Sequence, residues 1–334
     1  MTGPLEHVHL KANGVELHIA HQGAGPLVVM CHGYPGLWFS WRHQLKVLAD
    51  AGFTAAAIDM RGYGGSSRPR EVNAYGYDKL SADVLSVLDY FGYEQAVLIG
   101  HDFGANLAWH MAVYYPSRVR AVVALCVPYD MDLAGGGDVP PSQLYAAIAE
   151  QHFFHMHYFQ KECVAERHCL GREREFLTKL FWALSAEGKL LDWQSFPSEG
   201  THYIDVLEEP PEQLPWSWLS VEDMNYYVAQ YLAAGPDLTF IGGANAYRVM
   251  DYNWHLQRSR AHAKVTVPAL FVGGQEDPVT SMAGSAAFEH MRARVEDLRG
   301  VELLAGAGHF VQQEKPEPLN SLLIEFLGGL QSCP

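Results

Sequence analysis

Short apolar runs alternate with segments of helical periodicity over the first part of the chain. The runs at residues 26–31, 54–58, 95–99 and 121–127 have the length and apolar content of buried strands. Apolar residues recur at helical spacing from Leu80 to Phe91, and residues 104–115 form a second helical segment. Because strands and helices alternate, we predict right-handed crossovers and a mostly parallel sheet flanked by helices, which is the α/β class.

The N-terminus has the pattern of a β-hairpin. Residues 7–11 and 15–20 each alternate between apolar and polar side chains, and they flank the dipeptide Asn13-Gly14. Asparagine and glycine tolerate the positive φ angles of a tight two-residue turn. An antiparallel pair is therefore expected before the parallel strands.

The alternation stops after Pro128. Residues 130–263 contain aromatic-rich helical segments at 153–159 and 176–184 and a proline-rich stretch at 209–211, with no clean strand pattern. Strand patterns resume at 269–273 and 301–304, and a last helix covers 318–326. We predict a core domain formed by residues 1–129 and 264–334, with a helical domain inserted at 130–263.

Composition and charge narrow the function classes. The formal net charge of -15 argues against nucleic acid and against anionic membrane surfaces as partners. The N-terminus has no secretory pattern, and no apolar run approaches the roughly 20 residues that a membrane span needs. The five cysteines lack metal-like spacing. A cytoplasmic protein without a bound metal is expected, and its oligomeric state stays open.

The strand at 95–99 leads into Gly100-His101-Asp102-Phe103-Gly104 and then into a helix. Small residues around a strand-to-helix turn are typical of a nucleophile elbow, which projects its central side chain. A pair of glycines four apart is weak by itself, but here a strand precedes it and a helix follows. We identify Asp102 as the candidate nucleophile.

The remaining parts of a catalytic triad follow in order. Asp277 comes after the strand at 269–273, and His309 comes after the strand at 301–304. The order nucleophile, acid, histidine along the chain is typical of α/β-hydrolases. The loop His32-Gly33-Tyr34-Pro35 follows the first buried strand, so the backbone N–H groups of Tyr34 and Phe103 are predicted to form an oxyanion hole.

These motifs, together with Asp59-Met60-Arg61-Gly62-Tyr63-Gly64 and Gly308-His309-Phe310, resemble those of soluble α/β-hydrolase-fold epoxide hydrolases over nearly the whole chain. The resemblance implies that residues 130–263 form a cap over the active site. It also implies two cap acids, usually tyrosines, that hold the epoxide oxygen. Three places depart from the family pattern: Gly36 stands where glutamate is common, Phe103 stands where tryptophan is frequent, and the place of the first cap tyrosine falls on His155.

The cap acids are inferred from the same resemblance. Asn245-Ala246-Tyr247-Arg248 is similar to the family's second-tyrosine motif, so Tyr247 takes that role. Aligning Tyr158-Phe159-Gln160 on the family pattern puts His155 in the place of the first tyrosine. Tyr158 remains the alternative, because a phenol needs no special protonation state to donate. If His155 serves, a limb near its ordinary pKa of about 6.5 is expected in the pH profile of alkylation.

The predicted reaction converts an epoxide to a vicinal diol through an alkyl ester on Asp102. Water activated by His309, with Asp277 behind it, then hydrolyses the ester. No metal or cofactor is required. Two alternatives stay open: a haloalkane dehalogenase-type hydrolase, and a catalytically silent binding module on the same fold. The physiological epoxide and its stereochemistry are not predicted.

Overall fold

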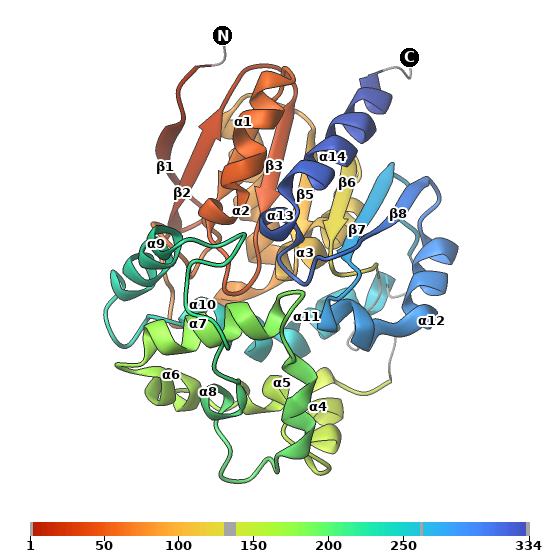
Figure 1. Ribbon diagram of the computed structural model, residues 1–334. Coiled ribbons are helices and arrows are strands. Elements are labelled where there is room, and N and C mark those ends of the chain that lie inside the picture. The colour runs from red at the N-terminus through yellow and green to blue at the C-terminus, as the bar shows by residue number, and fades with distance from the viewer. Residues whose placement is uncertain (1–2, 130–137, 261–262, 332–334) are drawn as a thin grey trace.

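An eight-stranded sheet forms the centre of the structure, a computed structural model that describes residues 3–129, 138–260 and 263–331 (Figure 1). The strand order is β1-β2-β4-β3-β5-β6-β7-β8. The strands are β1 (Glu6–Ala12), β2 (Val15–Gln22), β3 (Leu27–Cys31), β4 (Thr54–Ile58), β5 (Ala96–His101), β6 (Val119–Leu125), β7 (Ala269–Gly274) and β8 (Leu298–Leu304). From β4 to β8 all neighbours are parallel, which confirms the predicted α/β class.

The predicted hairpin is also confirmed. Strands β1 and β2 pair antiparallel, with Ala12 opposite Val15 at the turn. Asn13 has φ 50° and Gly14 has φ 75°, so both turn residues adopt the left-handed region that this dipeptide favours. The hairpin joins the parallel strands through an antiparallel pairing of β2 with β4.

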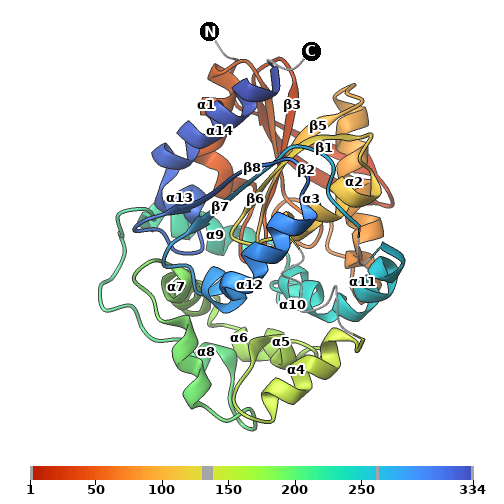
Figure 2. The ribbon, with the colours of Figure 1, turned by 90° about the vertical axis from the view of Figure 1, so that its right-hand side faces the viewer.

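Helices cover both faces of the sheet (Figures 1 and 2). Helices α1 (Arg42–Asp50) and α14 (Pro316–Gln331) lie on one face, and α2 (Tyr77–Tyr90) and α3 (Phe103–Tyr114) lie on the other. Alternate residues of β3 enter different hydrophobic clusters, Val29 on one side and Val28 and Met30 on the other. Burial on both faces is the reason that the parallel strands read as continuous apolar runs.

Residues 138–260 contain helices and no strand. The helices are α4 (Pro141–Ala149), α5 (His155–Tyr158), α6 (Val164–Cys169), α7 (Glu173–Leu184), α8 (Tyr203–Val206), α9 (Val221–Leu232), α10 (Ile241–Arg248) and α11 (Met250–Gln257). Most of this segment lies beyond one end of the sheet, in the lower part of Figure 1. The predicted boundary at residue 130 falls in 130–137, outside the described residues. The division into two domains stays a prediction.

The helix predicted at 153–159 is wrong in extent. Only α5, four residues long, is helical there. Phe154 is extended, with φ -139° and ψ 115°, and the Phe153 N–H donates to the Phe196 carbonyl at 2.6 Å. This tertiary hydrogen bond and the burial of Phe153 and Phe154 outweigh the local helical pattern.

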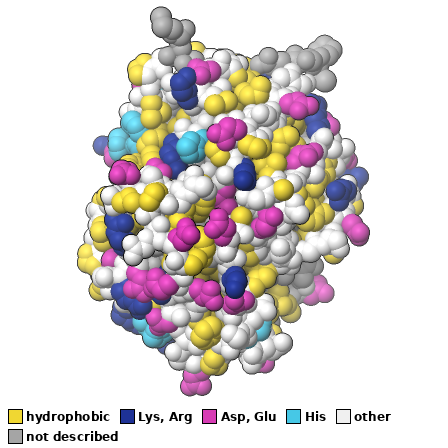
Figure 3. Space-filling view, viewed as in Figure 1, with side chains coloured by type: hydrophobic (Ala, Val, Ile, Leu, Met, Phe, Trp, Pro, Cys, Tyr) yellow, Lys and Arg dark blue, Asp and Glu magenta, His cyan; other side chains and the backbone are white. Residues whose placement is uncertain are grey.

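Acidic and basic side chains are interspersed on the face seen in Figure 3. Within the described residues, none of the helices has the length and hydropathy that crossing a bilayer requires.

Candidate active site

Asp102 occupies the sharp turn between β5 and α3. Its backbone is strained, with φ 55° and ψ -122°, a conformation that L-residues rarely adopt. Neighbouring backbone approaches so closely that side chains are excluded: a Cβ on Gly104 would lie 2.0 Å from the Cys31 carbonyl oxygen. A Cβ on Gly33 would lie 2.1 Å from Oδ1 of Asp102. The glycines of the two motifs therefore make room for the elbow and for its carboxylate.

The loop after β3 contacts that carboxylate directly. The Tyr34 N–H donates to Oδ1 of Asp102 at 2.9 Å. Phe103 is the first residue of α3, so its N–H has no acceptor within the helix and is left for an external oxygen. The two predicted oxyanion-hole residues thus flank the same carboxylate.

His309 lies between two carboxylates. Its Nδ1 is 3.2 Å from Oδ1 of Asp277, and its Nε2 is 3.6 Å from Oδ2 of Asp102. Asp277 is fully buried and caps helix α12 (Pro278–Arg294), where the Val279 N–H donates to its Oδ1 at 2.9 Å. The Thr280 hydroxyl donates to Oδ2 at 2.7 Å. These bonds fix the Asp277 carboxylate, and through it the imidazole.

Charge pairing governs protonation in this group. Burial by itself would lower the pKa of His309, but the carboxylates of Asp277 and Asp102 outweigh it and raise the pKa well above 6.5. Burial would likewise raise the pKa of Asp102, yet its pKa is lowered because His309 and the Tyr34 N–H stabilise the anion. The free site therefore favours an ion pair between Asp102 and His309.

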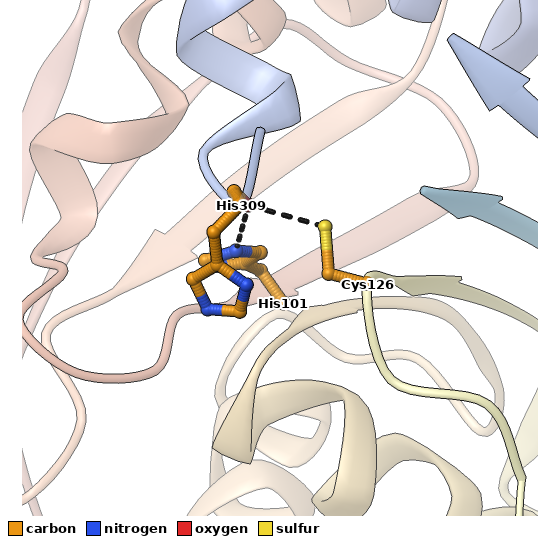
Figure 4. A group of neighbouring side chains, drawn as sticks. All are labelled: His101, Cys126 and His309. Atoms are coloured by element: carbon orange, nitrogen blue, oxygen red, sulfur yellow. Dashed lines mark hydrogen bonds between the residues drawn. The ribbon is translucent and has the colours of Figure 1, made fainter. Parts of the chain in front are cut away.

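His101 and Cys126 lie next to His309 (Figure 4). His101 Nε2 donates to the His309 carbonyl at 2.7 Å, and the Cys126 thiol donates to the same oxygen at 3.1 Å. Ligand atoms of the three residues lie within 4.8 Å of one another. Burial raises the pKa of the Cys126 thiol to about 12, whereas a metal needs the thiolate. The arrangement favours support of the His309 backbone over metal binding.

A largely apolar pocket opens in front of Asp102. Its lining comes from the loops of the sheet and from the helical segment. The residues that line it are Tyr34, Asp102, Phe103, Asn106, Val127, Tyr145, His155, Met156, Leu180, Leu184, Leu190, Tyr203, Tyr247, Met250, Val279, Met282 and His309. A carboxylate facing aliphatic and aromatic walls suits a small apolar substrate.

Two of the three candidate cap acids line this pocket. The ring of Tyr247 meets the edge of His155, with centroids 5.2 Å apart and an interplanar angle of 88°. The Tyr158 hydroxyl instead pairs with Nδ1 of His168 at 2.8 Å, and Tyr158 is not among the lining residues. The pocket thus brings together Asp102, His309, His155 and Tyr247.

The pKa of His155 is lower than the sequence led us to expect. Its burial lowers the pKa to about 3, because the imidazolium would be desolvated. The predicted limb near pH 6.5 is therefore wrong for this histidine, which stays neutral in ordinary buffers. Its Nδ1 is buried and has no hydrogen-bond partner among the residues that the structure describes.

The fold and the sequence are similar to those of known proteins. Residues 26–316 match the alpha/beta hydrolase fold family. The chain is 36% identical to "Epoxide hydrolase A" of Mycobacterium tuberculosis, over 99% of both chains. The chain belongs to the epoxide hydrolases of the α/β-hydrolase fold. It is 34% identical to "Epoxide hydrolase B" of the same organism, over 97% of this chain and 99% of that protein.

Solved epoxide hydrolases share the whole architecture. One from an endophytic Streptomyces has a TM-score of 0.89 at 34% identity, covering 98% of this chain and 96% of the other. Epoxide hydrolase A from Mycobacterium thermoresistibile has a TM-score of 0.87 at 38% identity, covering 98% and 99%. The likeness therefore extends through the helical segment as well as the sheet.

Several residues of this epoxide hydrolase site were missed by sequence reasoning. Tyr203 and Tyr145 line the pocket from α8 and α4, and Tyr203 stacks on His155 with centroids 5.7 Å apart. Thr280, whose hydroxyl donates to Asp277, was missed as well. Its position three residues after the helix-capping aspartate could have indicated this contact. Nothing in the local sequence separates the two tyrosines from core aromatics.

Proposed function

We propose that the chain hydrolyses epoxides to vicinal diols, with Asp102 as the nucleophile and without a metal or cofactor. The observation that carries the proposal is an aspartate at the elbow, facing the apolar pocket, with His309 Nε2 3.6 Å from its Oδ2. Esterases of this fold use serine at that position. A carboxylate suits attack on an sp³ carbon.

In the first step Oδ2 of Asp102 attacks a ring carbon, and the C–O bond of the ring breaks as the new ester bond forms. The departing oxygen gains negative charge and needs a donor. Tyr247 is the proposed donor, since burial raises the pKa of its phenol well above 10 and keeps the proton in place. The neutral imidazole of His155 is the proposed second donor.

In the second step water attacks the ester carbonyl carbon while His309 takes its proton. Forming the ester removes the charge of Asp102, one of the two carboxylates that raise the pKa of His309. The pKa of His309 therefore falls in the intermediate, the state in which it must act as a base. The oxyanion then forms at Oδ1, beside the N–H groups of Tyr34 and Phe103. When it collapses, the bond between the carbonyl carbon and the diol oxygen breaks, that oxygen takes the proton held by His309, and the diol leaves.

The dehalogenase alternative receives less support. A departing halide needs N–H donors beside the nucleophile, and Phe103, which lines the pocket there, offers none from its ring. A silent module is disfavoured because the pocket, the nucleophile and the base are all in place.

The expected location is cytoplasmic, and the expected organisation is a core with a helical cap at 130–263. Support for the location is that the four cysteines among the described residues are free. Support for the cap is that the pocket is walled by α4, α5, α7, α8, α10 and α11.

Replacing Tyr247 with phenylalanine should slow alkylation by about a hundredfold, because one donor to the leaving oxygen is lost while the ring remains. Hydrolysis of the ester should change little. Rapid-quench measurement of ester formation checks this, with Tyr252→Phe on α11 as the control. An unchanged alkylation rate would remove Tyr247 from the mechanism.

His155→Phe should slow alkylation by roughly tenfold or more, and Tyr158→Phe should leave it within about twofold. The reason is placement: His155 lines the pocket, whereas the Tyr158 hydroxyl is paired with His168. No limb from His155 is expected between pH 5 and 8, because its pKa is about 3. The reverse result, a crippled Tyr158→Phe beside an active His155→Phe, would restore the two-tyrosine pair.

A product assay tests the function itself. Styrene oxide, cyclohexene oxide and a long-chain epoxide are incubated with the protein, and diol is measured by chromatography. A bromoalkane and an aryl ester serve as competing substrates. Halide release without diol from any epoxide would favour the dehalogenase instead.

A further inference from the structure

The carboxylate of Glu314, the last residue of α13 (Val311–Glu314), accepts three backbone hydrogen bonds. The N–H groups of Ala186 and Gly308 donate to Oε2, both at 2.9 Å. The Phe310 N–H donates to Oε1 at 3.0 Å. Two of these donors stand on either side of His309, and the third belongs to the turn after α7. One side chain therefore ties the loop that carries His309 to the helical segment.

That loop also packs backbone against backbone on residues 184–186. The His309 N–H donates to the Leu184 carbonyl at 2.8 Å. A Cβ on Gly308 would lie 2.3 Å from the Ser185 carbonyl carbon and 2.4 Å from the Ala186 nitrogen. The backbone position of His309 is thus fixed by contacts with the helical segment as well as with the core. Glycine at 308 permits the close approach.

We infer that Glu314 is a positioning residue that sets the place of His309 by holding its loop against residues 184–186. The inference rests on the proposed function and assigns a residue that acts on one half-reaction. Glu314 does not line the pocket and so touches no substrate; its hydrogen bonds near the chemistry are to the backbone N–H groups on both sides of His309. Charge-assisted hydrogen bonds to a carboxylate are stronger than neutral ones, so they hold the loop of His309 firmly in place.

Because His309 acts as a base only on the ester, the loss of Glu314 should affect hydrolysis and spare alkylation. In Glu314→Gln the amide oxygen can still accept two N–H groups, but the amide nitrogen has no lone pair for the Phe310 N–H. A displaced base slows its step steeply. We expect ester hydrolysis to slow by roughly tenfold to a hundredfold, with alkylation within about twofold.

The experiment follows ester formation and decay with styrene oxide by rapid quench and mass spectrometry. The result is read as the ratio of the two rate constants in one sample, which does not depend on the folded fraction. Glu317→Gln, exposed in the first turn of α14, is the matched control and should leave the ratio unchanged.

A second variant tests the contact between the loop of His309 and residues 184–186 without changing Glu314. Gly308→Ala keeps Glu314 but drives the loop away from residues 184–186, so the same selective loss of hydrolysis is expected. If both variants keep the ratio of the parent, or slow the two steps equally, Glu314 is not a positioning residue. If the parent itself forms no ester, the proposed function fails, and the two failures are told apart.

Discussion

Replacing His309 with glutamine is expected to stop turnover while the first chemical step continues. Glutamine cannot accept a proton from water at neutral pH, so the ester on Asp102 should persist. A fall in turnover of about 10⁴-fold or more is expected for loss of such a base. Mass spectrometry of the intact protein should show the mass of one substrate molecule added to the chain.

The control for this experiment is His255→Gln, which changes an exposed histidine on α11. It should turn over like the parent and accumulate no adduct. A His309→Gln variant that retains turnover and accumulates no ester would show that another group activates the water.

Asp277→Asn is expected to lower ester hydrolysis by about 10⁴-fold. The carboxylate accepts from Nδ1 of His309, which holds the tautomer with a free Nε2 and stabilises the imidazolium that forms. An amide has half of that acceptor capacity and no charge. Stopped single-turnover reactions measure the hydrolysis rate directly.

Glu276 is the matched control for that substitution. It is exposed and accepts the Gly306 N–H at 3.0 Å, outside the pocket lining. Glu276→Gln should leave hydrolysis unchanged. Full activity in Asp277→Asn with a loss in Glu276→Gln would mean that the order of motifs along the chain had identified the wrong carboxylate.

The core of the fold was predictable because its signals are local. The strand at 54–58 was placed to the residue, and Asn13-Gly14 alone determined the hairpin turn. The elbow was predictable for the same reason, since its glycines precede and follow Asp102 within a few residues. Where backbone geometry is dictated by short-range sterics, the pattern of residue types is sufficient.

The helical segment was less predictable because its contacts are distant in sequence. The choice between His155 and Tyr158 depends on which side chain faces a pocket built from the loops of the sheet and several separate helices. Both residues share one short helix, so periodicity cannot separate them. The Glu314 carboxylate accepts a hydrogen bond from the Ala186 N–H, 128 residues away, and no local pattern indicates such a bond.

Isotope tracing in a single turnover tests the central claim most directly. With enzyme in excess over styrene oxide in ¹⁸O-labelled water, the ester route transfers an original oxygen of Asp102 to the diol and leaves the label on the protein. We predict an unlabelled diol and one ¹⁸O in the peptide that contains Asp102. A labelled diol with an unlabelled peptide would mean that water attacks the epoxide directly, and the proposed role of Asp102 as nucleophile would be wrong.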